Sequence, residues 1–307
     1  MRELKKVWLA SVVGVVGMMA LGASAAAQPL RVVATTGMVA DLVTRVGADA
    51  VVVEPLMGPG VDPHLYRATA SDVRRLQRAD AIFYNGLKLE GRLEETLERI
   101  GKRRGTVFAV TATVAGERLL KEGEGEDAVA DPHLWFDVSL WAETVPAVVA
   151  GLSKVAPARA GEFAARGEVV GRELAELHAW AVAKAAEVPE AQRVLVTSHD
   201  AYSYFGRAYG FQVVGLQGLS TVNEAALVDM AKLVDFIRER GLKAVFVESS
   251  VPKATIERIA EDAGVVIGAE LFSDAMGASG QLRLGYDVGT YDGMVRYNLT
   301  AIVEALR

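Results

Sequence analysis

Short apolar segments alternate with longer amphipathic ones along most of the chain. In the first half, four apolar runs end in turn residues: 31–35, 51–56, 81–84 and 107–110. Segments between them, such as 39–46 and 71–78, repeat apolar positions every three or four residues, as one face of a helix does. Strands that alternate with helices indicate parallel βαβ units.

The second half of the chain repeats this pattern. Its apolar runs are residues 194–197, 212–216, 244–247 and 265–267, and its helical segments are residues 224–240, 256–262 and 291–305. Residues 194–210 also follow the strand–loop–helix order of residues 32–47. We therefore predict an α/β protein with two similar lobes, each a (β/α)4-type unit with a parallel sheet.

A long amphipathic segment separates the two halves. Residues 158–188 lie between Pro157 and Pro189, where proline is typical of a helix start and a helix stop. About 31 residues would form a helix of roughly 46 Å, long enough to run along both lobes. Glycines in its first half weaken it, so two shorter helices with a break near Gly167 are the alternative.

The N-terminal segment has the pattern of a secretory signal peptide. Basic residues near the start are followed by an apolar run of about 15 residues and then by small residues of the A-x-A type. The apolar run is shorter than the roughly 20 residues that span a membrane. We therefore predict four segments: a signal peptide (1–27), an N-terminal lobe (28–150), a linking helix (151–189) and a C-terminal lobe (190–307).

Composition narrows the classes of function. Hydrophobic residues make up 51% and charged residues 23% of the chain, which is typical of a globular protein. A net charge of −6 with no long basic run disfavours nucleic acid as a partner. The chain has no cysteine, which excludes disulfides, thiolate ligands and a lipidated N-terminal cysteine. We expect an exported protein of the periplasm without a lipid anchor.

Three of the four histidines follow predicted strands. His64, His133 and His199 stand where the carboxyl ends of strands face the ligand crevice of an open α/β sheet, and we expect all three in the cleft between the lobes. The first two share the tripeptide Asp-Pro-His, in which proline stiffens the loop and the aspartate can accept a local hydrogen bond. The fourth, His178, lies within the long helix and is expected to have no ligand role.

Three imidazoles indicate a divalent metal site that also takes an oxygen ligand. Asp274 follows the predicted strand at 265–267, and Glu248 follows the strand at 244–247, so either could supply this oxygen. Asp200 is next to His199, but a role at a helix N-terminus is more typical for it. Residue pattern alone leaves Asp274 and Glu248 open.

The segments that carry these residues resemble a known family. They include VVATTGMVADLV, GPGVDPHLYRATASDV, DPHLWFDVSLW, RVLVTSHDAYSYF, VFVESSVP and GAELFSDAMG, in order along the chain. They are similar to segments of the TroA-like, cluster A-I solute-binding proteins of bacterial ABC importers for zinc and manganese. The resemblance implies two β/α lobes bridged by one long helix, with a metal ion in the cleft between them. It implies His64, His133, His199 and Asp274 as ligands, and so favours Asp274 over Glu248.

The resemblance also implies a function. A monomer would capture Zn²⁺ or Mn²⁺ as the transported ligand in the periplasm and deliver it to an ABC permease in the inner membrane. Zinc-specific members often carry a His-rich loop, but residues 121–131 here are short and acidic. Manganese-specific members often have glutamate where this chain has His199. The ligand set therefore does not decide between the two ions.

The alternative is a secreted metallohydrolase with a zinc ion bound by three histidines. Such an enzyme keeps one position of the metal open for a water molecule. Four protein ligands close a tetrahedral site, and no acidic residue stands at a catalytic spacing from a ligand histidine in a known pattern. We therefore predict a binding protein rather than an enzyme.

Overall fold

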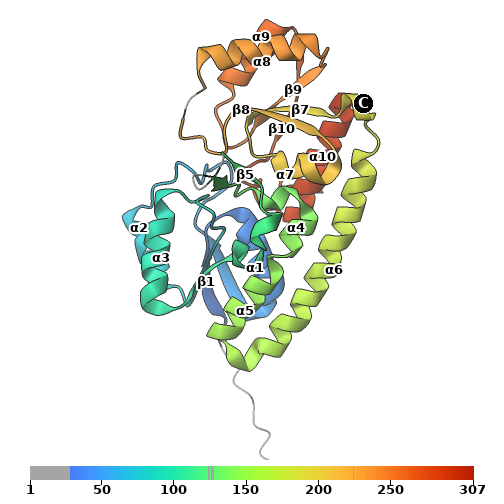
Figure 1. The fold of residues 1–307 in the computed structure, drawn as a ribbon. Helices are drawn as coiled ribbons and strands as arrows, with labels where there is room; N and C mark the ends of the chain where they lie inside the picture. Colours follow the sequence, from blue (N-terminus) through green and yellow to red (C-terminus); the bar gives the residue numbers. More distant parts are fainter. Residues whose placement is uncertain (1–27, 124, 126–127, 224) are drawn as a thin grey trace, which may run out of the picture.

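The computed structural model describes residues 28–307 apart from 124, 126, 127 and 224. The predicted signal peptide, residues 1–27, lies outside the described residues. In the described part, two α/β lobes are stacked, and one long helix runs along the side of both (Figure 1). Short antiparallel hairpins accompany the main sheets: β5–β6 (Lys121–Glu122, Val129–Ala130) and β11–β12 (Leu282–Arg283, Tyr286–Asp287).

The first lobe is built on a parallel sheet with the strand order β2-β1-β3-β4. Its strands are β1 (Leu30–Ala34), β2 (Val51–Pro55), β3 (Ala81–Tyr84) and β4 (Val107–Ala109). Alternate residues of β1 enter different cores: Val32 packs with helix α1 (Gly37–Gly47), and Val33 packs with α2 (Ala70–Arg78) and α3 (Arg92–Arg104). Both faces of this sheet are therefore covered by helices, as in other parallel sheets.

The second lobe repeats this architecture. Its strands are β7 (Val194–His199), β8 (Gln212–Gln217), β9 (Ala244–Glu248) and β10 (Val266–Leu271). β8 pairs with β7, β10 pairs with β9, and β7 contacts β9, which gives the order β8-β7-β9-β10. Its helices are α7 (Ser203–Tyr209), α8 (Leu227–Glu239) and α9 (Ala254–Ala263). The predicted strands of both halves are confirmed, and the two lobes share one strand order.

The long helix α6 (Ala160–Ala185) is continuous. A 3-10 turn at Pro157–Arg159 precedes it, so its regular part is shorter at both ends than the predicted 158–188. The alternative with a break near Gly167 is wrong. A Cβ atom at this glycine would lie 2.6 Å from Val149 Cγ2, so the missing side chain lets α6 approach helix α5 (Val145–Val155) closely.

The two lobes share a hydrophobic core. Helix α6 contacts α1, α5 and α4 (Val138–Ala142) of the first lobe, and α7 and α10 (Tyr291–Leu306) of the second. Helix α10 also contacts α1, so buried side chains such as Leu42, Leu174 and Ile302 belong to one cluster. Among the described residues, no helix is long and apolar enough to span a membrane.

Candidate metal centre

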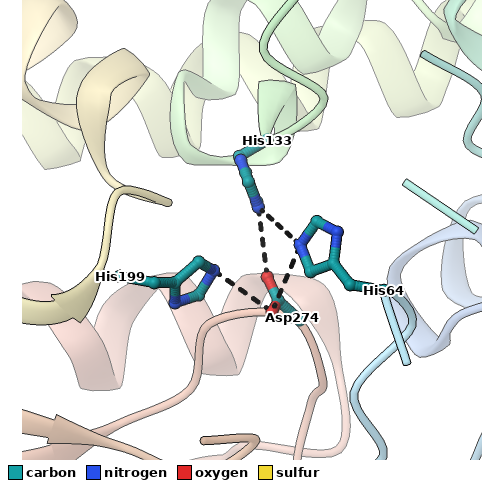
Figure 2. Close-up of side chains that lie close together, drawn as sticks. All are labelled: His64, His133, His199 and Asp274. Carbon is teal, nitrogen blue, oxygen red and sulfur yellow. Dashed lines mark hydrogen bonds and ion pairs between the residues drawn. The ribbon is translucent and has the colours of Figure 1, made fainter. Parts of the chain in front are cut away.

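Three histidines and one aspartate converge between the lobes (Figure 2). His64 lies in the loop between β2 and α2, and His133 precedes a 3-10 turn at Leu134–Phe136 that leads into α4. His199 is the last residue of β7, and Asp274 follows β10. All four are buried, and one ligand atom from each lies within 4.8 Å of those of the other three. The structure thus brings together the four residues that the sequence analysis singled out.

The spacing of these atoms fits a tetrahedral ion. The Nε2 atoms of His64 and His133 are 3.3 Å apart. The Asp274 carboxylate lies 3.4 Å from His133 Nε2, 3.3 Å from His199 Nε2 and 3.8 Å from His64 Nε2. A tetrahedral site with metal–ligand bonds of about 2.0–2.1 Å has edges of about 3.3–3.4 Å. A divalent ion could therefore enter with only small movements of the side chains.

Carboxylates stand behind two of the histidines. Asp131 Oδ1 lies 2.7 Å from His133 Nδ1, and Glu248 Oε2 lies 2.6 Å from His199 Nδ1. Each also accepts a hydrogen bond from the backbone N–H of its histidine, at 2.9 Å in both cases. A carboxylate in this position fixes the ring and the tautomer, which leaves Nε2 free for an ion. Glu248, the competitor for the oxygen ligand, is thus placed behind His199 and not among the four converging atoms.

The two Asp-Pro-His tripeptides adopt the expected local turn. Asp62 Oδ1 accepts a hydrogen bond from His64 N at 2.8 Å, as Asp131 Oδ1 does from His133 N. The other oxygen of Asp62, Oδ2, accepts a hydrogen bond from Thr221 Oγ1 at 2.5 Å. Since Thr221 follows β8, this bond links the His64 loop to the second lobe.

The surroundings divide the histidines into two kinds. Burial lowers the pKa of His64 to about 4. Burial also acts to lower the pKa of His133, but the carboxylates of Asp131 and Asp274 outweigh it and raise this pKa to about 9. The pKa of His199 is held well above its usual value because Glu248 and Asp274 outweigh burial in the same way. The histidines in turn overcome burial and hold the pKa of Asp274 well below its usual range.

The Asp274 loop is attached to several elements. Asn298 on α10 accepts a hydrogen bond from Phe272 N at 3.0 Å and donates one to Phe272 O at 2.7 Å. Tyr202 Oη donates to the same carbonyl, and Trp135 Nε1 donates to Ser273 O, both at 3.1 Å. Sequence reasoning missed Asn298 as a supporting residue, and its place among the apolar residues of the last helix is the one signal that could have indicated it.

The two remaining candidates lie apart from the converging atoms. Asp200 Oδ1 accepts a hydrogen bond from Ser203 Oγ at 2.6 Å, at the beginning of α7. This contact is close to its expected role at a helix N-terminus, although the side chain makes no capping bond to the backbone of α7. His178 is half-buried on α6, where its ring centroid lies 5.7 Å from that of Tyr209.

Known proteins share this architecture. The sequence profile of the family described as zinc-uptake complex component A, periplasmic (ZnuA), matches residues 32–305. The zinc-binding protein TroA of Treponema pallidum is 46% identical over 289 residues, which cover 92% of this chain and 91% of that protein. The manganese-binding lipoprotein MntA of Bacillus subtilis is 43% identical over 285 residues, which cover 91% and 90%.

The likeness extends to three dimensions. The solved structure of the periplasmic zinc-binding protein TroA from Treponema pallidum matches with a TM-score of 0.85 at 46% identity. The match covers 91% of this chain and 99% of that one, so it includes both lobes and the helix between them.

Proposed function

The chain belongs to the ZnuA family of periplasmic zinc-uptake components, and we propose that it captures a divalent transition-metal ion and delivers it to the permease of an ABC transporter. The observation that carries this proposal is the convergence of four buried ligand atoms, two from each lobe, at the spacing of a tetrahedral ion. We propose His64, His133, His199 and Asp274 as the ligands. Because one chain supplies all four atoms, the site needs no second copy, and we propose a monomer.

The transported ion is Zn²⁺ or Mn²⁺. Relatives of nearly equal identity to this chain are named for different metals, zinc in one case and manganese in the other, so identity does not separate the two. Three imidazole nitrogens suit zinc, whereas a carboxylate also suits manganese. A nitrogen and oxygen site generally binds Zn²⁺ more tightly than Mn²⁺, so the ion carried in the cell depends on which metal is available.

Export to the periplasm is consistent with both the family and the N-terminal segment. The family is described as periplasmic, whereas several relatives are named as lipoproteins. A lipoprotein anchor of that kind is attached to a cysteine, and this sequence contains none. We therefore propose that the chain works in the periplasm without such an anchor.

We also propose that the chain has no catalytic role. A hydrolytic zinc ion has three protein ligands and an open position for water. The Asp274 carboxylate stands at the fourth corner here, within 3.8 Å of all three Nε2 atoms. Peptidase, esterase or phosphatase turnover by the metal-loaded protein would contradict this proposal.

Metal binding by the purified chain tests the proposal. We expect one Zn²⁺ per chain after equilibrium dialysis, with Mn²⁺ competing more weakly, as measured by elemental analysis. His64→Ala should lower the affinity by orders of magnitude because it removes a ligand, whereas the matched variant His178→Ala should leave it unchanged. Equal affinities of all three proteins would contradict the proposed site.

A further inference from the structure

Glu90 is a buried carboxylate outside the group of converging ligands. Its side chain is shielded from solvent and accepts three hydrogen bonds. The donors are Thr35 Oγ1 at 2.7 Å, Asn85 N at 2.7 Å and Gly86 N at 3.1 Å. Such bonds compensate the cost of burying a charged group. The carboxylate thus joins the end of β1 to the segment 85–91, which connects β3 to α3.

The segment 85–91 has an unusual backbone conformation. Leu87 and Lys88 have φ angles of 56° and 67°, a region that residues other than glycine rarely adopt. Conformations of this kind persist only where the surrounding structure holds them in place. The bonds from Asn85 N and Gly86 N to Glu90 cross this strained turn and close it.

The same segment touches the backbone beside both histidines of the first lobe. Asn85 Nδ2 donates a hydrogen bond to Pro132 O at 3.0 Å, and Pro132 directly precedes His133. At the other end, a Cβ atom on Gly91 would lie 2.9 Å from His64 O, so the backbone there packs directly against His64. One segment therefore sets where both Asp-Pro-His turns stand relative to each other.

We propose that Glu90 is a positioning residue of the metal centre, which holds His64 and His133 at the separation that a bound ion needs. The inference rests on the proposed function, since it requires that these histidines bind an ion. Glu90 touches neither histidine and acts through Asn85, Gly86 and Gly91.

The test uses Glu90→Gln, which keeps the volume of the side chain but puts an amide NH₂ group where one carboxylate oxygen accepts hydrogen bonds. We expect its Zn²⁺ affinity to fall by about tenfold or more, as for other residues that orient metal ligands from outside the site. With Co²⁺ as the probe, we also expect altered visible absorption bands, because these bands report the geometry of the ligands.

Two controls separate positioning from loss of charge or stability. Glu98→Gln makes the same chemical change at an exposed position of α3 and should match the wild type. Val148→Ala removes buried apolar atoms from α5, and should lower the melting temperature without changing the Co²⁺ spectrum. If Glu90→Gln does not fold, Asn85→Ala serves instead, since it removes the bond to Pro132.

The outcomes are distinct. A folded Glu90→Gln protein with wild-type affinity and spectrum would overturn this inference and leave the proposed function intact. A Val148→Ala protein with the same spectral change would also overturn it, because general destabilisation would then explain the effect. A wild-type chain that binds neither Zn²⁺ nor Co²⁺ would overturn the proposed function and this inference together.

Discussion

At the residue scale, the charges of the candidate site balance without an ion. Three buried carboxylates face the histidine rings: Asp131, Glu248 and Asp274. The raised pKa values of His133 and His199 keep both rings protonated near neutral pH, so the group carries a charge of −1. A divalent ion that displaces one proton from each ring leaves the same charge of −1. This exchange explains how a fully buried site can be filled and emptied without unfolding.

The first prediction concerns the pH dependence of metal binding. An ion competes with the protons on its ligands. His133, with a pKa of about 9, and His199 both hold a proton at pH 7–8, whereas His64, with a pKa of about 4, holds none. We therefore expect about two protons to be released per ion at pH 7–8, and the affinity to rise with pH by about two decades per unit.

Isothermal titration in buffers of different ionisation enthalpy counts these protons. Three histidines with ordinary pKa values near 6.5 would release fewer than about one proton at pH 7.5. That smaller number would show that the carboxylates do not set the charge of the rings. Glu248→Gln is the informative variant, since it removes the carboxylate behind His199 and should lower the count by about one.

The Asp-Pro-His turns could be predicted from the sequence, but the role of Glu248 could not. Two such tripeptides point to ligands because the aspartate and proline act on the histidine beside them. Glu248 is 49 positions away from His199, and only the pairing of β7 next to β9 places its carboxylate against the ring. Sequence position gave it the same rank as Asp274, because both follow strands of one sheet.

At the element scale, the glycines of α6 have opposite roles. A Cβ atom at Gly171 would meet nothing within 4 Å, whereas one at Gly167 would collide with Val149. We predict that Gly171→Ala raises the free energy of unfolding by up to about 1 kcal/mol, the difference in helix propensity. Gly167→Ala should lower it, because α5 and α6 must move apart. Thermal unfolding of the two variants measures this, and equal shifts in melting temperature would refute it.

Helix α10 supports the Asp274 loop through one side chain. Asn298→Ala would leave the N–H and C=O groups of Phe272 without this partner, and should lower the free energy of unfolding by about 1–3 kcal/mol. It should also reduce metal affinity, because Asp274 follows Phe272 by two residues. Denaturant unfolding and Zn²⁺ titration measure the two effects. The control is Glu304→Ala on the exposed side of α10, and a loss of affinity in that variant would contradict the explanation.

The order of strands and helices could be predicted, but not which elements pack together. Period-two and period-3.6 patterns identify β1, β7 and α10 because each buries one set of side chains. They do not reveal that α10, the last element of the chain, packs on α1 of the first lobe. A hydrophobic face indicates that a helix has a partner and does not indicate which one.

At the scale of the whole molecule, the lobes are joined by more than a hinge. α6 and α10 each contact both lobes, and one buried cluster runs through the interface. A wide opening would expose this cluster to water, at a cost of about 25 cal/mol per Å² of apolar surface. We therefore predict that the radius of gyration from X-ray scattering in solution is the same for metal-free and metal-loaded protein. A clear contraction on loading would show a large rigid-body movement instead.

The central claim, a single ion bound by four residues of both lobes, is tested most directly by a crystal structure of the zinc-loaded protein with anomalous data at the zinc edge. The account predicts one anomalous peak between the lobes, about 2.0–2.2 Å from the Nε2 atoms of His64, His133 and His199 and from an Asp274 oxygen. Asp131 and Glu248 should remain on the Nδ1 atoms of their histidines. A peak elsewhere, or one ligated by Glu248 with Asp274 turned away, would contradict the claim.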